Sequence, residues 1–537
     1  MPKLVPSRAV LAGGLSGLLA GAAAVAASEA ATALLTGVTS PLLSVGNRAV
    51  DAAPRPLKEF AIETFGTADK PVLIGSVIGA VALLAIVAGA LGVRRPKVAV
   101  GMFLGLSAVA AAAALTDRAA TAGPFLRLVP VAALVVVGLV TLVLLLRLLR
   151  GESAVPGRGD ATATDSSGHD RDLETSGTSG NVSPGRRSFL LAAAAVAGIA
   201  ALGGVVARSF GDLAATASRA GIKLPKAAQP APAVPEGVEV GVDGVSPYVT
   251  SNEEFYRVDN ALQVPDVPIE GWTLRIHGMV DKEIELTYAD LLERNLVEKR
   301  ITLTCVSNPV GGEYLGNASW LGVPIHELLA EAGPQDGADA VKSTSADDFT
   351  IGTPLSVLTD PERGALVAIG MNGEALPLEH GFPARMVTPG LYGYVSATKW
   401  LVDLEVTRFA DFKAYWTTRG YSAEAPIKTS SRIDVPRSFA SVKAGKTPIA
   451  GVAWSQSRGI AKVEVRVDRG DWQEAELGAE DSIDTWRQWV WYWDATPGNH
   501  LIEVRATDAE GMTQTGERAP IAPDGSTGWD STNVQVA

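Results

Sequence analysis

The chain has little of several residue types. Cys305 is its only cysteine among 537 residues. This excludes an intramolecular disulfide framework, a zinc site built on several thiolates and a c-type haem attached through two cysteines. Only five histidines occur, the first at His169, and all eleven tryptophans lie at or after Trp272. The two ends of the chain therefore differ in composition.

Charge divides the chain in the same way. Residues 1–230 carry 21 Lys and Arg against 13 Asp and Glu, whereas residues 231–537 carry 25 against 45. Binding to phosphate backbones requires clustered basic residues, so the acidic part argues against nucleic acid as a partner. The mean hydropathy of +0.19 lies between values typical of soluble proteins and of transporters. It indicates an apolar membrane segment joined to a soluble body.

Five apolar stretches are long enough to cross a membrane, which requires about 20 residues. They are Ala9–Ala27, Val72–Val93, Val98–Leu115, Phe125–Leu149 and Phe189–Ala207. Basic residues flank them on alternate sides, as expected for cytoplasmic loops. We predict a multi-pass protein of the cell membrane with a cytoplasmic N-terminus and an extracytoplasmic body after residue 208. A buried hairpin of core helices is the alternative.

The fifth stretch opens with Gly185-Arg186-Arg187-Ser188-Phe189-Leu190, which resembles a twin-arginine export signal. That route carries folded cargo and suits a domain that acquires a cofactor in the cytoplasm. A basic pair that merely flanks a span is the alternative. Residues 151–185 are rich in Gly, Ser, Thr and Asp and predict a flexible cytoplasmic linker. We expect a second linker over residues 209–236.

After Gly237 the pattern changes to short alternating runs. Residues 272–278 predict a strand, and residues 286–294 and 324–332 predict short helices. Residues 451–537 read as short antiparallel strands, with period-two alternation at residues 462–468 and a tryptophan cluster at residues 486–493. We expect a β-sandwich with these tryptophans in its core.

Cys305 lies in the segment Leu303-Thr304-Cys305-Val306-Ser307-Asn308-Pro309, and its residue type allows three roles. It could be an inert buried thiol, a nucleophile paired with a base, or a metal thiolate. No other cysteine is available as a ligand. A metal held here would therefore need its remaining ligands from a cofactor.

Several segments, in order, resemble the sulfite oxidase family of molybdopterin-dependent oxidoreductases, in a membrane-anchored bacterial form. Thr250–Arg257 looks like the segment that contacts the pterin. Cys305–Asn308, followed by Trp320, resembles the metal-ligand loop. His380–Gly390 and Ala397–Trp400 resemble the segments that bind the pterin phosphate. The resemblance covers residues 249–536.

The resemblance implies the fold. An N-terminal α-helical membrane domain would hold four transmembrane helices within residues 1–150 and a fifth within residues 186–208. An α+β molybdopterin-binding catalytic domain would follow over residues 237–425. An immunoglobulin-like β-sandwich would occupy residues 426–537 and form a homodimer.

The resemblance also implies the site. One molybdenum–molybdopterin would bind per chain, with Cys305 as the protein's thiolate ligand to the metal. The residues that it implies for cofactor binding are Asn252, Tyr256, Arg257, Cys305, Asn308, His380, Arg385, Thr398 and Lys399. The stretch Trp416-Thr-Thr-Arg419-Gly-Tyr421 matches the one that carries the family's active-site tyrosine, so Tyr421 would be catalytic beside Cys305.

The implied chemistry is two-electron oxygen-atom transfer to or from a small sulfur or nitrogen compound. Sulfite oxidases place two arginines directly after the metal loop, whereas this chain has Pro309 and Val310. Sulfite is therefore disfavoured, unless Arg419 or Arg432 compensates, and a neutral S-oxide, N-oxide or thioether is favoured.

No histidine precedes His169 and none lies in the fifth stretch, so we predict no haem in the spans and an external electron carrier. The alternatives are an S-oxide or N-oxide reductase, and a cofactor-free envelope binding protein.

Overall fold

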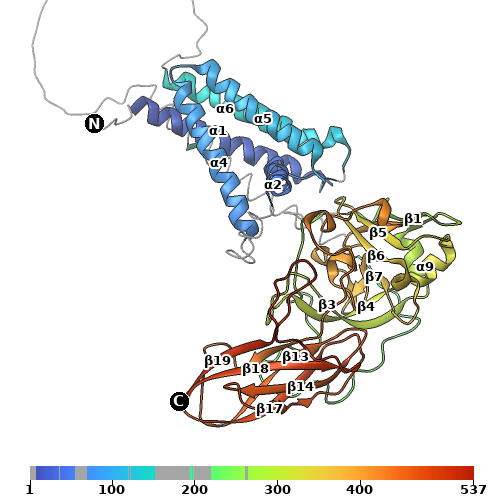
Figure 1. The fold of residues 1–537 in the computed structure, drawn as a ribbon. Coiled ribbons are helices and arrows are strands. Elements are labelled where there is room, and N and C mark those ends of the chain that lie inside the picture. The colour runs from blue at the N-terminus through green and yellow to red at the C-terminus, as the bar shows by residue number, and fades with distance from the viewer. Residues whose placement is uncertain are drawn as a thin grey trace, which may run out of the picture. The chain divides into compact units, whose positions relative to one another are not determined.

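The computed structural model describes residues 8–35, 37–54, 69–118, 120, 122–150, 191, 194, 195, 198, 219, 221–260, 264, 265 and 267–537. The chain divides into two compact units, Met1–Ala214 and Ala215–Ala537 (Figure 1). Each unit is treated by itself below. The predicted linker at residues 151–185 and the twin-arginine-like segment lie outside the described residues, as does nearly all of the predicted fifth span.

The first unit is helical. Its long helices are α1 (Arg8–Thr32), α4 (Asp69–Gly92), α5 (Pro96–Thr116) and α6 (Pro124–Leu149). Within the described residues, four helices are long and apolar enough to cross a membrane. They coincide with the first four predicted stretches, although α1 continues beyond Ala27.

Close packing in this unit depends on glycine. A Cβ atom on Gly17 of α1 would lie 2.0 Å from the carbonyl oxygen of Ala85 on α4, and one on Gly89 would lie 2.2 Å from the carbonyl oxygen of Gly13. Small residues let the backbones of two apolar helices meet, which is how such helices associate in lipid.

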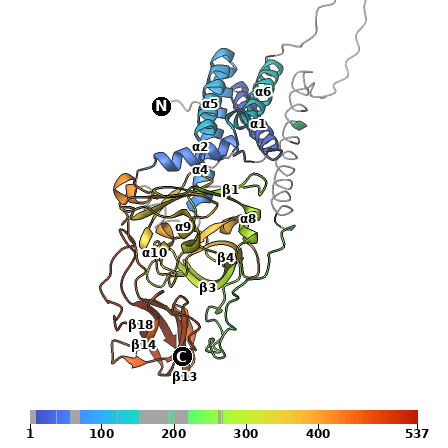
Figure 2. The same ribbon diagram turned by 90° about the vertical axis from the view of Figure 1, so that its right-hand side faces the viewer.

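A further helix, α2 (Pro41–Ala52), was not predicted from the sequence. It lies crosswise to α5 in Figure 2. The Ser40 side chain caps its N-terminus by accepting from the Leu43 N–H at 3.3 Å. Ser44 and Asn47 donate to the Asp117 carboxylate at 2.6 and 3.0 Å, which joins α2 to the end of α5. At twelve residues the helix is too short to register as a span.

The second unit begins with an α+β region built on two sheets. One has the strand order β2-β1-β10-β5-β6, and the other has the order β3-β4-β7-β8 with β9 paired to β7. Strands β1 and β10 run parallel, and the other pairs are antiparallel. The strands are β1 (Thr273–Gly278), β2 (Ile284–Thr287), β3 (Val297–Thr304), β4 (Leu315–Pro324), β5 (Ala340–Ser345), β6 (Thr350–Pro354), β7 (Leu366–Met371), β8 (Glu374–Ala375), β9 (Arg385–Val387) and β10 (Leu401–Thr407).

Short helices connect these strands: α8 (Tyr288–Glu293), α9 (Ile325–Ala332) and α10 (Leu355–Thr359). The strand at residues 272–278 and the helix at residues 324–332 are confirmed. The helix predicted at residues 286–294 was wrong at its start, because β2 continues to Thr287. The Thr287 hydroxyl accepts from the Asp290 N–H in a capping box, which begins the helix only at Tyr288.

The C-terminal region is a sandwich of two sheets, with orders β11-β13-β17-β16 and β12-β19-β18-β14-β15. Its strands are β11 (Ser430–Val435), β12 (Ser441–Val442), β13 (Gly445–Trp454), β14 (Ile460–Val467), β15 (Gln473–Glu474), β16 (Glu476–Leu477), β17 (Arg487–Ala495), β18 (Gly498–Asp508) and β19 (Asp530–Val536). Val463, Val465 and Trp489 are fully buried between the sheets. The predicted β-rich C-terminal region is confirmed.

An ion pair joins β3 to the sandwich. Arg300 donates to both carboxylate oxygens of Asp481, at 2.5 and 2.7 Å, and the two side chains are 9% and 4% exposed. The Tyr248 hydroxyl donates to the same carboxylate at 2.7 Å. Removing one partner of such a pair is unfavourable, because it leaves the other charge desolvated and uncompensated.

We expect Asp481→Ala to lower the free energy of unfolding of the second unit by about 3 kcal/mol. Urea unfolding followed by tryptophan fluorescence measures this, because all eleven tryptophans lie in that unit. The exposed pair Arg275–Glu283, at 2.9 Å, provides a control. Glu283→Ala should leave the urea midpoint unchanged, and equal midpoints for the two variants would contradict the assignment.

Candidate active site

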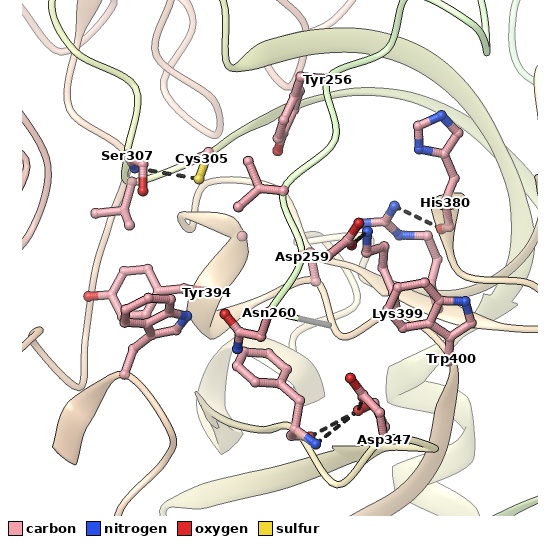
Figure 3. Close-up of a pocket in the computed structure, with 18 of the residues that line it drawn as sticks. Tyr256, Asp259, Asn260, Cys305, Ser307, Asp347, His380, Tyr394, Lys399 and Trp400 are labelled. Carbon is pink, nitrogen blue, oxygen red and sulfur yellow. Dashed lines mark hydrogen bonds and ion pairs between the residues drawn. The ribbon is translucent and has the colours of Figure 1, made fainter. Parts of the chain in front are cut away.

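A cavity of about 900 Å³, part of it open to solvent, lies in the second unit. Figure 3 shows Cys305 and Tyr256 at one end and His380, Lys399 and Trp400 at the other. Its walls come from the segment before β1, the loop after β3, the β5–β6 turn and the loops around β9 and β10. The lining residues are Phe255, Tyr256, Val258, Asp259, Asn260, Cys305, Val306, Ser307, Ser345, Asp347, Phe349, His380, Arg385, Gly393, Tyr394, Ala397, Lys399, Trp400, Trp416 and Tyr421.

Cys305 immediately follows β3 and is 8% exposed. Burial raises the pKa of its thiol, although the backbone N–H of Ser307 donates to Sγ at 3.4 Å. Asn308 closes the loop by donating its N–H to the Cys305 carbonyl and accepting from the Tyr314 N–H. A thiol in this setting keeps its proton unless a metal ion replaces it.

Arg385 on β9 is a buried cation, 5% exposed. Its Nη1 donates to the His380 carbonyl at 3.0 Å, and its guanidinium lies 5.0 Å from the centre of the Trp320 ring. Among the described residues no carboxylate forms an ion pair with it. Burial lowers the pKa of Arg385 to about 10, so it stays charged at neutral pH. A desolvated charge that lacks a counterion makes this wall an anion site.

His380 lies beside Arg385 as a neutral donor. Burial lowers the pKa of its imidazole. Its Nε2–H donates to the backbone carbonyl of Asn252 at 2.8 Å. The ring also packs edge-to-face against Phe255, with centroids 5.5 Å apart.

Lys399 forms a very short ion pair with Asp259 and donates to the Glu379 carbonyl at 2.9 Å. The Asp259 side chain is 1% exposed and also accepts from Arg257 at 2.5 Å. Asp259 was not among the predicted site residues. The carboxylate neutralises much of the positive charge expected at Lys399.

The structure brings six of the ten predicted site residues into the cavity wall and leaves four outside it. Those in the wall are Tyr256, Cys305, His380, Arg385, Lys399 and Tyr421, and those outside are Asn252, Arg257, Asn308 and Thr398.

The four outside residues have structural partners. The Asn252 amide donates to Glu374 at 2.6 Å, and Thr398 shares a 2.6 Å hydrogen bond with Ser343. Arg257 forms an ion pair with Asp259. Asn308 is hydrogen-bonded within its own loop. These contacts support the backbone on which the lining residues sit.

Sequence reasoning missed an aromatic wall and a second carboxylate. The rings of Tyr394, Tyr421 and Trp416 form a chain with centroid separations of 5.5 and 5.3 Å. Asp347 lies nearly buried opposite, in a short contact with the Ser345 hydroxyl, and burial raises the pKa of its carboxyl. The segment at residues 345–349 reads only as a turn between strands, so no sequence signal marks it.

The residues considered for substrate charge lie elsewhere. Pro309 and Val310 line a separate cavity of about 300 Å³ on the sandwich side of the Cys305 loop. Arg419 stacks on Tyr415, 3.5 Å from the ring centre, and Arg432 pairs with Asp434 at 2.6 Å. Neither arginine lines the Cys305 cavity, so neither takes the place of the two missing arginines in its wall.

The donor set fits a molybdopterin. Among the described residues, no group of three or more His, Cys, Asp and Glu side chains could hold a metal ion. A metal at Cys305 would therefore take its other ligands from a cofactor. The cavity offers a thiol at one end and an uncompensated guanidinium at the other, which match the metal and phosphate ends of such a group.

Comparison with known proteins finds a matching family profile and relatives of that family. The sequence profile of the oxidoreductase molybdopterin binding domain matches residues 261–416. The sulfite oxidase of Gallus gallus is 30% identical over 322 residues, which cover 51% of this chain and 70% of that protein. The mitochondrial sulfite oxidase of Macaca fascicularis is 30% identical over 324 residues, which cover 51% of this chain and 58% of that protein.

More distant similarities are also found. The NADPH nitrate reductase of Fusarium oxysporum is 29% identical over 279 residues, covering 42% of this chain and 31% of that enzyme. The crystal structure of the sulfane dehydrogenase SoxCD from Paracoccus pantotrophus aligns with a TM-score of 0.45 at 24% identity, covering 50% of this chain and 75% of that one. The chain spans 58% and 52% of the length of the mitochondrial sulfite oxidases of macaque and mouse.

We expect Arg385→Met to reduce the pterin bound per chain by more than about tenfold, because a charge-assisted hydrogen bond to an anion is lost. The melting temperature should stay the same or rise, since a buried charge is replaced by an apolar side chain. Fluorescence of the oxidised, released pterin measures the content.

Arg408→Met is the control for this variant, because Arg408 is exposed and forms a surface ion pair with Asp411 at 2.7 Å. It should leave the pterin content unchanged. Equal pterin contents in the native chain and Arg385→Met would contradict the assignment of Arg385.

Proposed function

Because this chain belongs to the sulfite oxidase family of molybdopterin-dependent oxidoreductases, we propose that the Cys305 cavity is its active site. The observation that carries the proposal is one cavity with the chain's only thiol at one end and the buried Arg385 at the other, where no carboxylate of the described residues pairs with it. The reaction is a two-electron oxygen-atom transfer to or from a small sulfur or nitrogen compound. The oxidative and reductive directions use the same residues.

The chain's residues divide the work between holding the cofactor and handling the substrate. Molybdopterin, when bound, supplies the metal and the oxygen-atom-transfer chemistry. Cys305 would bind the metal as thiolate, while Arg385 and Lys399 would hold the phosphate. His380, whose Nε2–H donates to the Asn252 carbonyl, would fix the loop beside them. The four predicted cofactor-binding residues that lie outside the cavity wall would support the loops that carry these side chains.

Tyrosine hydroxyls line the substrate side. Burial raises the pKa of Tyr256 and of Tyr394, so both phenols keep their protons at any working pH. Tyr394 donates to the Ser422 carbonyl at 2.8 Å and packs against Tyr421. In the proposal, Tyr421 donates a hydrogen bond to a substrate oxygen while the aromatic wall keeps water out.

The charge of the wall favours a neutral substrate. Lys399 is already paired with Asp259, Asp347 adds a second carboxylate to the wall, and the phosphate of the cofactor would take up the charge of Arg385. A doubly charged anion such as sulfite gains little attraction from such a wall. This supports a neutral S-oxide, N-oxide or thioether, independently of the residues at positions 309 and 310.

We further propose the cellular arrangement. The described helices and the stretch Phe189–Ala207 would anchor the chain in the cell membrane, with the N-terminus cytoplasmic and the active site extracytoplasmic after twin-arginine export. Basic residues between α4 and α5 and after α6 support this topology. Residues 237–425 would be the catalytic domain and residues 426–537 an immunoglobulin-like dimerisation domain. Electrons would pass to an external carrier, without haem in the chain.

We expect Cys305→Ser to lose turnover by at least about a thousandfold, because the metal loses its protein ligand. Part of the pterin should remain bound, since Arg385 and Lys399 are intact. Turnover and pterin content are measured on protein from a cofactor-competent host. Normal activity in Cys305→Ser would contradict thiolate ligation, and less than about a tenth of an equivalent of molybdenum or tungsten in the native chain would contradict the enzyme itself.

We expect the native enzyme to use a neutral sulfoxide or N-oxide with a kcat/KM at least about a hundredfold above that for sulfite. A turnover screen with artificial electron donors and acceptors measures both directions. Asp259→Asn removes the carboxylate that pairs with Lys399, and it should raise kcat/KM for sulfite by about tenfold. Sulfite as the best substrate of the native enzyme would contradict the proposal.

A further inference from the structure

A second large cavity lies inside the helical unit. Its empty space of about 850 Å³ is partly open to the surroundings and is lined by residues of α1, α2, α4, α5 and α6. Its wall is apolar except for two hydroxyl groups, those of Ser28 and Ser107. Spaces between the helices of a bundle are among the places where small molecules bind.

Neither hydroxyl has a proton left to donate to a ligand or to water. Ser28 donates to the Val25 carbonyl at 2.8 Å and Ser107 donates to the Phe103 carbonyl at 2.9 Å, each within its own helix. A water molecule needs two or more polar partners to stay in a cavity. The side chains of the wall therefore offer only two serine oxygens that can accept a hydrogen bond, and the cavity suits an apolar occupant.

The surrounding contacts keep the space open. The backbones of α1 and α4 already touch at Gly17 and Gly89, so these two helices cannot move closer to fill it. At α2, Ser44 and Asn47 are fixed to Asp117, and this places Val45 at the cavity wall. An empty apolar space of this size loses contacts that an occupant restores.

We propose that the cavity holds one hydrocarbon chain of a membrane lipid, either an acyl or an isoprenoid chain, with its head group outside. The proposal rests on the proposed membrane location, where hydrocarbon chains form the medium around these helices. Along α1 the lining runs from Gly17 to Ser28. This is about 16 Å at 1.5 Å per residue, roughly half of the hydrocarbon thickness of a bilayer.

The test measures lipid that stays with the full-length chain. The chain is purified in a mild detergent, passed through gel filtration and extracted with organic solvent, and the extract is quantified by mass spectrometry. We expect the native chain to retain about one equivalent of lipid. Ala110→Phe, which projects a ring from α5 into the cavity, should retain at least about fivefold less.

Gly105→Phe is the matched control, because a Cβ atom on this residue of the same helix meets nothing within 4 Å. It should retain the native amount. On α4, Ala88→Phe is the cavity variant and Gly79→Phe is its control. A native chain without lipid, or equal losses in the cavity variant and its control, would overturn the proposal.

Two further experiments identify the molecule that occupies the cavity. Reconstitution into phospholipid nanodiscs with and without an isoprenoid quinone shows which chain is taken up. In a Cys305→Ser background, a cysteine introduced by A110C should label with a lipid-borne probe. Its crosslinking to residues 189–207 would instead show that the chain fills its own cavity and overturn the proposal. Carbonate extraction tests membrane insertion separately, so that loss of lipid from an inserted chain is not confused with failure to insert.

Discussion

The second unit depends on a buried positive charge that its own side chains do not balance. Moving a guanidinium out of water is unfavourable unless a counterion comes with it. Arg385 receives carbonyl contacts and a tryptophan face but no carboxylate among the described residues. Asp259, the carboxylate nearby, is taken by Lys399 and Arg257. A bound anion is therefore stabilised at the end of the cavity opposite Cys305.

The two ends of the cavity are held by different parts of the fold. Arg385 lies on β9, whose partner β7 is buried throughout. Cys305 lies at the end of β3, and the sandwich supports that strand. Gln456 donates to the Thr302 carbonyl and the Thr304 hydroxyl at 2.9 and 3.1 Å, and Arg300 pairs with Asp481. The C-terminal sandwich thus fixes the position of the thiol, whatever its role between copies of the chain.

Much of this could be predicted from the sequence, because segments with special backbone requirements leave a local signal. The cysteine loop and the His380–Arg385 segment were recognisable, as were the apolar spans and the alternating strands of the sandwich. The roles of Asp259 and Asp347 could not be read, because they depend on which distant side chain faces each carboxylate. For α2 the sequence gives only a short amphipathic pattern, and its place is set by the Asp117 contacts. Pro309 and Val310 drew attention by position, but the loop turns them away from the Cys305 cavity.

The central claim is that Cys305 is the protein's ligand to molybdenum. X-ray absorption at the molybdenum edge tests it most directly, because it counts sulfur neighbours of the metal whether or not the enzyme turns over. The account predicts one sulfur fewer around the metal in Cys305→Ser than in the native chain. The same number of sulfur neighbours in both proteins would contradict it.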